Sequence, residues 1–428
     1  MGRRILVTGG DTFFATRLVH QLGLRGCDVT VADSHWLSPG KASRYATRRL
    51  KTPALSSDPG GYLDAILREL SQRSYDLLLP TFEETLLFTE YQADIRRFTR
   101  LFVPPFGTMH DLHHKPSLHA KCLQLGLPTP PSVEPRTEAD LESMTRRIAF
   151  PVVLKLPMGN NSAGLTFCDN RASLIQSFSR LAARQAACGG EPPFVQQKID
   201  GDLVFTLCFC DAGRKLAEVV YRTRRTYPEA GGTSAHRESI RGGEVARLSE
   251  RLVAATRWTG FLGLDFIVER STGTAYLIDA NTRANPAVHL GFLAGLDWAQ
   301  LVIDRLADVA SPVQTAKPGV HVHSLLLDLG WLLERFSLRP TNLAPFLLRC
   351  AEFITPPWPV HSRNELLEIG EPLSGVVMAL QAATCLARSA VFGGDLGQML
   401  FEAANYNSAT AAQYRNRRCG NFVRDSVA

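Results

Sequence analysis

Short apolar runs and one helical repeat alternate over the first hundred residues. Residues 5–7 form an apolar run, residues 14–24 carry apolar side chains at helical spacing, and residues 28–32 form a second run. This order predicts a strand, a helix and a strand, the unit from which parallel sheets are built. Further strands are expected at residues 76–80 and 103–106. The pattern therefore predicts an N-terminal α/β domain with a parallel sheet.

A different pattern follows, in which strands come in adjacent pairs. A stiff Pro-rich connector at residues 126–131 separates the first expected helix from the strands. The expected helices are 111–125, 172–188 and 245–258, and the expected strands are 150–155, 194–199, 203–210, 215–221, 263–268 and 275–280. Turn residues 211–213 and 271–274 predict that two of these strand pairs are hairpins.

From about residue 311 the pattern changes to amphipathic helices broken by Pro-rich turns. We therefore expect four units: an N-terminal α/β domain (1–106), a central region with a Gly-rich loop (107–200), a catalytic region (201–310) and a mostly helical extension (311–428). The extension is expected either to shape a substrate pocket or to form an oligomer interface, so a homodimer is one option.

Composition narrows the class of protein. The chain has 428 residues, 45% of them hydrophobic and 21% charged, which suits a folded multidomain protein. The net charge of +6 is mild, and basic residues do not cluster as in nucleic-acid-binding proteins. No run of about 18 apolar residues exists, so we expect no membrane partner. Nine scattered cysteines, without metal spacing or a signal-peptide pattern at the start, predict free thiols and a cytoplasmic protein.

The second hairpin carries the most informative chemistry. Residues i and i+2 share a face of a strand, so Asp279 and Asn281 point the same way, with Arg283 just beyond. If the turn centres near residue 272, Asp265 lies opposite Asp279, and two like charges so placed repel each other. A divalent cation such as Mg²⁺ would relieve that repulsion, and Arg283 would bind a phosphoryl group. A solvated hairpin face is the alternative.

Two lysines stand out in a chain with only eight of them. Lys155 ends an apolar strand and precedes the Gly-rich loop 159–164, and Lys115 precedes the connector. A lysine at the end of a buried strand is uncommon without an anion to meet, and loop N–H groups together with lysines cradle phosphates. Each lysine alone can equally be a surface residue.

With these motifs in order, the sequence resembles the ATP-grasp superfamily over about residues 4–310, especially its carboxylate–amine ligases and carbamoyl-phosphate-synthase-like members. The resemblance rests on Lys115, on residues 151–164, on residues 194–201, on Asp265 and on residues 277–283. It implies an α/β protein with a Rossmann-like N-terminal domain and ATP held between two sheets.

The resemblance also implies roles for particular residues. Asp265, Asp279 and Asn281 would hold Mg²⁺ (or Mn²⁺), and Arg283 and Lys155 would assist catalysis. The implied ATP-binding residues are Lys115, Lys155, Gly159, Ser162, Gly164, Gln196, Gln197, Lys198, Ile199 and Asp202. Gln197, either Asp202 or Leu203, and the two metal aspartates stand where glutamate is commoner in the family.

The implied reaction joins a small-molecule carboxylate to an amine, through an acyl phosphate formed with release of ADP. Amino acids or small peptides are the expected substrates. In the basic stretch that follows residue 221, Arg222, Arg224 or Arg225 would bind a carboxylate and residues 231–234 would lie against substrate; an exposed basic loop is the alternative. His236 and His289 are further candidates, as are Glu83 and Glu84 at a strand end.

Other functions stay open at this point. Within acyl-phosphate chemistry they are a carboxylate–thiol ligase and a carbamoyl-phosphate-type enzyme. Residues 8–11 followed by Asp33 also suggest an NAD(P)-binding oxidoreductase, although the G-x-G-x-x-G fingerprint is absent. A non-catalytic nucleotide-binding protein is the third class, suggested by the missing glutamates.

Overall fold

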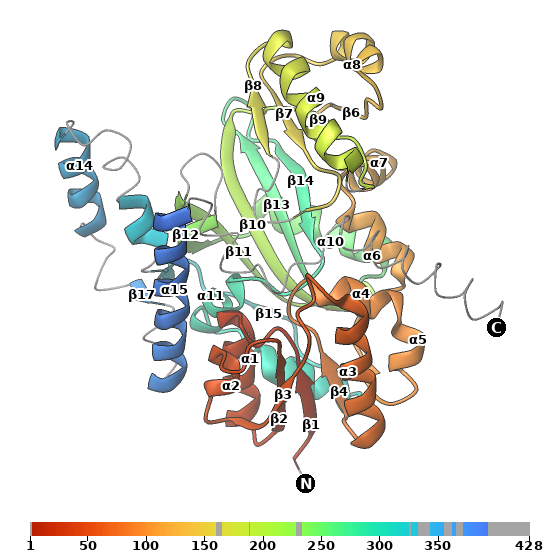
Figure 1. Ribbon diagram of the computed structural model, residues 1–428, viewed down its shortest axis with the longest axis vertical. Coiled ribbons are helices and arrows are strands. Elements are labelled where there is room, and N and C mark those ends of the chain that lie inside the picture. The colour runs from red at the N-terminus through yellow and green to blue at the C-terminus, as the bar shows by residue number, and fades with distance from the viewer. Residues whose placement is uncertain are drawn as a thin grey trace.

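Three sheets lie one after another along the long axis of the molecule (Figure 1). The computed structural model describes residues 2–159, 165–187, 189–227, 233–324, 327–332, 343–354, 362–364 and 371–392. A parallel sheet forms one end, a large, mostly antiparallel sheet the middle and a small antiparallel sheet the other end. None of the helices in these ranges is both long and apolar enough to cross a bilayer.

The N-terminal sheet is parallel throughout, in the order β3-β2-β1-β4-β5. Its strands are β1 (Arg4–Val7), β2 (Asp28–Asp33), β3 (Ala46–Lys51), β4 (Leu77–Leu79) and β5 (Arg100–Leu101). The prediction of a strand at residues 103–106 in this domain is wrong. Strand β5 ends at Leu101, before Pro104 and Pro105, whose nitrogens cannot donate a hydrogen bond to a neighbouring strand. The sequence analysis missed β3 because it is a basic edge strand with alternately exposed residues.

Helices flank this sheet: α1 (Phe13–Leu24), α2 (Pro39–Ala42), α3 (Pro59–Gln72), α4 (Glu84–Glu90), α5 (Gln92–Ile95) and α6 (Phe106–His113). Helix α1 begins at the expected place because Thr12 accepts a hydrogen bond from the Ala15 N–H. The carboxylate of Glu84 accepts hydrogen bonds from the N–H groups of Thr81 and Phe82 and from the Thr8 hydroxyl. Glu84 therefore fixes the turn before α4.

The helix expected over 111–125 is two helices. Helix α6 ends at His113, and α7 (Lys115–Leu125) begins at once in a new direction. Pro116 lies in the first turn of α7, where its missing N–H costs nothing, and His114 accepts a hydrogen bond from the Ser117 N–H. This break puts Lys115 at a helix start.

The small sheet has the order β6-β9-β7-β8 and is antiparallel. Its strands are β6 (Ser132–Val133), β7 (Val152–Lys155), β8 (Thr166–Cys168) and β9 (Phe194–Gln197), covered by α8 (Glu138–Met144), the 3₁₀ turn Thr145–Arg147 and α9 (Arg171–Ala187). Leu154, Leu174 and Phe178 belong to a core of its own. The small sheet is thus a separately packed layer.

The large sheet has the order β14-β13-β10-β11-β12-β16-β17, with β15 beside β11. Its strands are β10 (Gly201–Asp211), β11 (Arg214–Tyr227), β12 (Thr233–Ile240), β13 (Gly260–Glu269), β14 (Ala275–Asn281), β15 (Gln314–Thr315), β16 (His321–His323) and β17 (Ser362–Asn364). Both expected hairpins are present. Ala212 and Gly213 have positive φ at the β10–β11 turn, as tight hairpins require. Helices α10 (Gly243–Thr256), α11 (Ala287–Leu293) and α12 (Trp298–Leu306) accompany the sheet.

The large sheet shares its cores with the N-terminal domain. Leu6 of β1 and Leu264 of β13 belong to one cluster, and Ile5 of β1 and Leu207 of β10 belong to another. Continuous apolar packing of this kind fixes how the two units sit. The floor of the large sheet and the loops of the N-terminal domain therefore form one frame.

The described part of residues 311–428 contains helices α14 (Leu343–Ile354) and α15 (Pro372–Phe392). It also contains β15, β16 and β17, so this part is less purely helical than expected. Beside α15, the buried Glu371 accepts hydrogen bonds from Ser43 and Ser374 and lies 2.8 Å from His20 Nδ1. These contacts fasten the start of α15 to the N-terminal domain (Figure 1).

Candidate active site

A cavity of about 350 Å³ lies between the small and large sheets, next to the N-terminal domain. Its volume falls in the range of small-molecule sites. Its described lining includes Lys115, Lys155, Gly159, Gln196, Gln197, Lys198, Ile199, Asp265, Asp279, Asn281 and Arg283, all predicted from the sequence. The fold thus brings together residues that are up to 168 positions apart in the chain (283 − 115).

Two carboxylates face each other at the centre of this cavity. Asp265 on β13 pairs in register with Asp279 on β14, as the turn position predicted, and a β-bulge follows Asp265. Burial, and then the charge of Asp279, raise the pKa of Asp265 to about 7. Burial would also raise the pKa of Asp279, but Lys115 and Lys155 outweigh it and hold that pKa below its usual value. The pair is therefore incompletely ionised near neutral pH.

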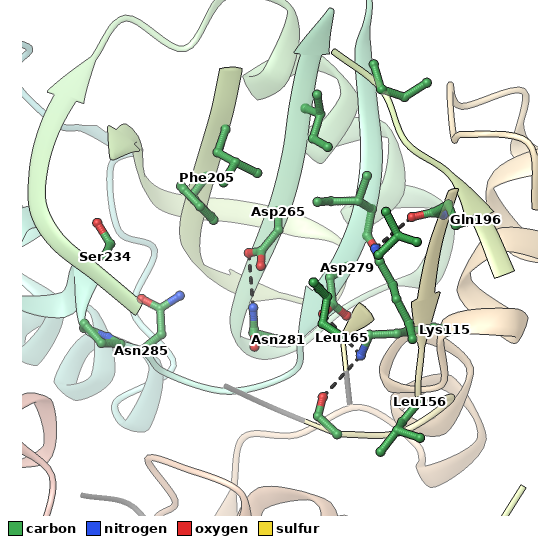
Figure 2. A pocket seen from close by; sticks show the side chains of 18 of the residues that line it. Lys115, Leu156, Leu165, Gln196, Phe205, Ser234, Asp265, Asp279, Asn281 and Asn285 are labelled. Atoms are coloured by element: carbon green, nitrogen blue, oxygen red, sulfur yellow. Dashed lines mark hydrogen bonds and ion pairs between the residues drawn. The ribbon is translucent and has the colours of Figure 1, made fainter. Parts of the chain in front are cut away.

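Three oxygen donors at this point suit a hard divalent cation. Asn281 lies two residues beyond Asp279 and donates from its amide to Asp265 Oδ1 at 3.1 Å, so the three side chains converge (Figure 2). Carboxylate and amide oxygens are the groups that bind Mg²⁺, which also keeps water or phosphate ligands. A bound cation would favour the ionised form of Asp265. The donor set therefore fits the metal expected from the sequence.

Both predicted lysines are buried and reach the same centre. Lys115 Nζ lies 3.2 Å from Asp279 Oδ2 and donates to the Gly159 carbonyl at 3.2 Å. Lys155 Nζ donates to Gln196 Oε1 at 2.7 Å and to the Ile278 carbonyl at 3.3 Å. Burial lowers the pKa of Lys155 to about 8. Such a partly desolvated ammonium gains most from an added anion.

Arg283 lines the cavity from the segment after β14, and two residues of the N-terminal domain contact its side chain. Its Nε donates to Glu83 Oε1 at 2.5 Å, and both side chains are almost fully buried. Its guanidinium also lies over the Phe82 ring, 4.3 Å from the centroid. Glu83 belongs to the N-terminal domain, so that domain orients a residue of the central cavity. Of the two glutamates at this strand end, Glu83 therefore orients Arg283, whereas Glu84 stabilises the turn before α4.

The linker between the two sheets forms one wall. Residues 196–199 line the cavity as predicted, and the side chain of Gln196 is buried between Lys155 and Ser132. Leu203 on β10 and Ile267 on β13, which pair in register, add apolar surface opposite this wall. An apolar slot beside backbone groups and two lysines is suited to a flat ring attached to phosphates. We call this side of the cavity, from Lys115 and Lys155 to Ile267, the lysine half.

The opposite side is lined by aromatic rings. The pairing places Asp279, Asp265, Phe205 and Tyr221 in one row across β14, β13, β10 and β11. The Phe205 and Tyr221 rings stack with centroids 5.2 Å apart. Phe205, Ser234 and Asn285 lie on one side of Asp265, and Lys115 and Gln196 on the other (Figure 2). We call this side the aromatic half; its lining consists of Phe14, Phe82, Phe205, Tyr221, Ser234, Arg237, Asn285 and Pro286.

Several predicted residues lie elsewhere. Asp202 points away from the cavity because strand alternation presents Leu203 instead, and it pairs with Arg270 at the surface. Arg224 is half-exposed and forms an ion pair with Glu238. It is not among the described residues that line the cavity. Ser162 and Gly164, and residues 231 and 232 of the Gly-rich stretch, fall outside the described residues.

The other candidates of this region also have structural partners. Arg222 and Arg225 form ion pairs with Glu238 and Asp328. His236 is buried next to His321, and burial and then Arg225 lower the pKa of His236 to about 3. His289 is buried in α11. Of the described Gly-rich stretch, Ser234 reaches the cavity.

The sequence analysis missed most of the aromatic half. Arg237 is buried on β12 and donates a hydrogen bond to the Ser234 carbonyl. In the sequence nothing distinguishes it from the other arginines of the basic stretch. The side chain of Asn285 can occupy its position only because residue 263 is glycine: a Cβ on Gly263 would lie 2.6 Å from Asn285 Nδ2. Phe14 and Phe82 come from the N-terminal domain. Only the register β13–β10–β11 could have identified Phe205 and Tyr221.

No protein-family model matches this sequence, and no curated protein does. Solved structures match the fold. A biotin carboxylase from Campylobacter jejuni superposes with a TM-score of 0.63 at 18% identity, over 74% of each chain. An L-amino acid ligase from Bacillus licheniformis has a TM-score of 0.57 at 18% identity, covering 72% of this chain and 75% of that one.

An N5-carboxyaminoimidazole synthetase from Staphylococcus aureus, complexed with ADP, also matches. Its TM-score is 0.62 at 13% identity, and the match covers 79% of this chain and 87% of that one. These neighbours share their fold with about three quarters of this chain. The predicted fold is confirmed: the chain has the ATP-grasp fold.

Proposed function

We propose that this protein is an ATP-dependent ligase that activates a carboxylate as an acyl phosphate and joins it to an amine. The observation that carries the proposal is the carboxylate pair Asp265–Asp279 flanked by the buried lysines Lys115 and Lys155 in one cavity. Two carboxylates and two ammonium groups that meet in one partly desolvated cavity suit a ligand that carries charges of both signs. A magnesium–triphosphate complex is such a ligand.

ATP and Mg²⁺ are the proposed cosubstrate and metal, with Mn²⁺ as a substitute. Asp265, Asp279 and Asn281 would hold the cation, which neutralises phosphate charge when bound. The lysine half would take the nucleotide, with the phosphates at Lys115 and Lys155. Among the neighbours, a 2-oxoglutarate carboxylase domain was solved with MgADP and bicarbonate, which supports the pairing of nucleotide and metal.

The proposed reaction has two displacements. A carboxylate oxygen of the acid attacks the γ-phosphorus of ATP, the bond to the bridging oxygen breaks, and ADP leaves. The amine nitrogen then attacks the acyl carbon, the carbon–oxygen bond to phosphate breaks, and phosphate leaves as the nitrogen loses a proton. Lys155 and Arg283 would stabilise the charge on the transferring group, while the cavity aligns the reactants. No protein nucleophile is needed.

The matched L-amino acid ligase supports amino acids as substrates, and the bicarbonate of the carboxylase structure supports a carboxylation as the second candidate. The oxidoreductase alternative is disfavoured by the loop before α1. Thr12 caps the helix there, and Asp11, Thr12 and Phe13 stand where a pyrophosphate-binding loop would carry its later glycines. Burial, and then Asp33, raise the pKa of Asp11.

A reducing, cytoplasmic location is part of the proposal. The seven cysteines within the described residues are all free, and five of them are buried. Cys208 and Cys210 are buried on β10, where the Cys210 thiol donates a hydrogen bond to the Cys208 sulfur at 3.4 Å and no disulfide joins them. No step of the proposed reaction uses a thiol.

The test is to incubate the protein with Mg²⁺-ATP, a panel of carboxylates including bicarbonate, and amines, and to follow ADP, phosphate and product mass. We expect ADP and phosphate in equal amounts and no AMP. Lys155→Ala should lower turnover about 10²-fold or more, because it removes a charge-stabilising group. Lys121→Ala is the matched control, since Lys121 on α7 is paired with Asp111 and is not among the described residues that line the cavity. Equal rates for Lys155→Ala and the wild type would refute the proposal.

A further inference from the structure

Within the described residues, four aromatic rings line the aromatic half of the cavity. Phe14 and Phe82 pack together with centroids 5.6 Å apart, next to the stacked pair Phe205–Tyr221. Phe205 keeps part of its surface exposed toward the cavity, whereas Tyr221 is nearly buried beneath it. Phe205 is thus the ring of these four that has exposed surface, and the other three are packed behind it. An apolar ring exposed in a concave site indicates an apolar ligand group.

The distance from the carboxylate pair to these rings is set by the sheet. Phe205 is the direct neighbour of Asp265, and Tyr221 is the direct neighbour of Phe205. Adjacent strands lie about 4.8 Å apart, so the ring pair extends from about 5 to about 10 Å from Asp265. An acid whose carboxyl group lies at Asp265 would therefore lay its side chain along Phe205 and Tyr221.

The charges of the aromatic half define the rest of the ligand. Among the described residues that line this half, none carries a carboxylate, so nothing there would neutralise a cationic side chain. Arg237 is 1% exposed and contributes a guanidinium at this end, and Arg283 contributes another at the centre. Both guanidinium groups already have partners, the Ser234 carbonyl and Glu83, so an acidic side chain would gain less in this half than an apolar one.

We infer that the acid activated by this protein carries a bulky apolar or aromatic side chain, which lies against Phe205 and Tyr221. This inference rests on the proposed ligase function and specifies its substrate class. It excludes bicarbonate, glycine, aspartate and lysine as preferred acids. Phe205 is the residue that decides the size of the side chain, because its ring forms the exposed face of the pair.

The test measures kcat/KM for a series of acids with Mg²⁺-ATP, using hydroxylamine as the amine to trap the acyl phosphate as a hydroxamate. The acids are phenylalanine, leucine, glycine, aspartate, lysine and bicarbonate. We expect phenylalanine and leucine to exceed the others by about tenfold or more, since a few buried methylenes give that discrimination. A preference for glycine, aspartate, lysine or bicarbonate would overturn the inference and leave the ligase function standing.

Two substitutions of Phe205 act in opposite directions. Phe205→Ala should reduce the preference for phenylalanine over glycine about tenfold, and Phe205→Trp should reject phenylalanine while glycine is still used. The KM for ATP should stay within about twofold in both, and Phe98→Ala, an exposed ring of the N-terminal domain, should change neither quantity. The two variants cannot both mimic a folding defect, because each predicts a different order of acids. Unchanged selectivity in both would refute the role of Phe205.

A different result separates the inference from the proposed function. If the wild type binds Mg²⁺-ATP in calorimetry but releases no ADP with any acid, the ligase function is wrong. Titration of 3-phenylpropionate against acetate then decides the inference by itself. Binding of phenylpropionate at least tenfold tighter than acetate supports an apolar-acid site, and equal binding overturns it.

Discussion

The two halves of the cavity are built on different principles. The lysine half is characterised by charged and polar groups at strand ends and in the linker, such as Lys155 and Gln196, which have specific partners. The aromatic half is characterised by rings from two domains, which meet by strand register and loop packing. The first half therefore depends on individual charges, and the second on shape.

This difference predicts how each half responds to change. Removing a charge from the lysine half leaves another charge unbalanced in a desolvated place, so the loss is large and affects every substrate. Changing a ring in the aromatic half alters volume and contact area, so the loss is smaller and differs from one acid to another. The following four experiments compare the two halves, from the largest expected effect to the smallest.

Asp279→Asn should give the largest effect. It removes a carboxylate of the proposed metal site and the ion-pair partner of Lys115, so we expect turnover to fall about 10²- to 10³-fold for every acid. Asp202→Asn is the matched control, since Asp202 is an exposed aspartate of the same large sheet. ADP release under saturating ATP measures both. A loss confined to some acids would contradict the division into two halves.

Glu83→Gln should have an intermediate effect. It removes the charge that balances Arg283, and we expect kcat to fall about tenfold or more while the KM for ATP changes little. Glu69→Gln is the control, because Glu69 is also buried and paired with an arginine, Arg48, but lies away from the cavity. Both variants should lower the melting temperature, and only Glu83→Gln should lower kcat. Equal kinetic effects would show that the pair only stabilises the fold.

The pH dependence of metal binding should be smaller still. With the pKa of Asp265 at about 7, a cation must displace a proton below that pH, so Mn²⁺ affinity should fall up to about tenfold per unit from pH 7 to 6 and level off above pH 7. The metal-free protein should also lose stability as the pH rises from 4 toward 7, because the folded state binds that proton more tightly than the unfolded one. Titration of Mn²⁺ without nucleotide, followed by electron paramagnetic resonance, measures the affinity. A constant affinity would show that Asp265 is already ionised.

Arg224→Ala should have the smallest effect, with kcat/KM for any acid within about twofold of the wild type. Its ion pair with Glu238 is half-exposed, and such pairs contribute little. Arg237→Ala provides the comparison, because it removes the buried guanidinium of the aromatic half, and kcat/KM for the acid should fall about tenfold or more. Steady-state kinetics with phenylalanine measures both. A larger loss in Arg224→Ala would place the acid outside the cavity.

Sequence patterns were sufficient for the ATP-grasp fold and most of the lysine half, because there the chemistry follows the local order of residues. Lys155 follows an apolar run, and Asp265 and Asp279 flank one turn, so their pairing could be counted from residue 272. The aromatic half depends on the β10–β11 and β10–β13 registers and on packing between domains. From the basic stretch the sequence suggested Arg224 on β11, whereas the arginine of this region that lines the cavity is Arg237 on the neighbouring strand β12.

The contact between Glu83 and Arg283 has a consequence for dissecting the molecule. The carboxylate comes from the first unit of the chain and the guanidinium from the third, so a fragment that begins after residue 106 would bury an arginine without its counter-ion. Such a fragment would also expose the apolar faces of Leu207 and Leu264 that the first sheet covers. Co-expression of the two pieces, rather than removal of the first, is accordingly the route to a divided protein with a complete cavity.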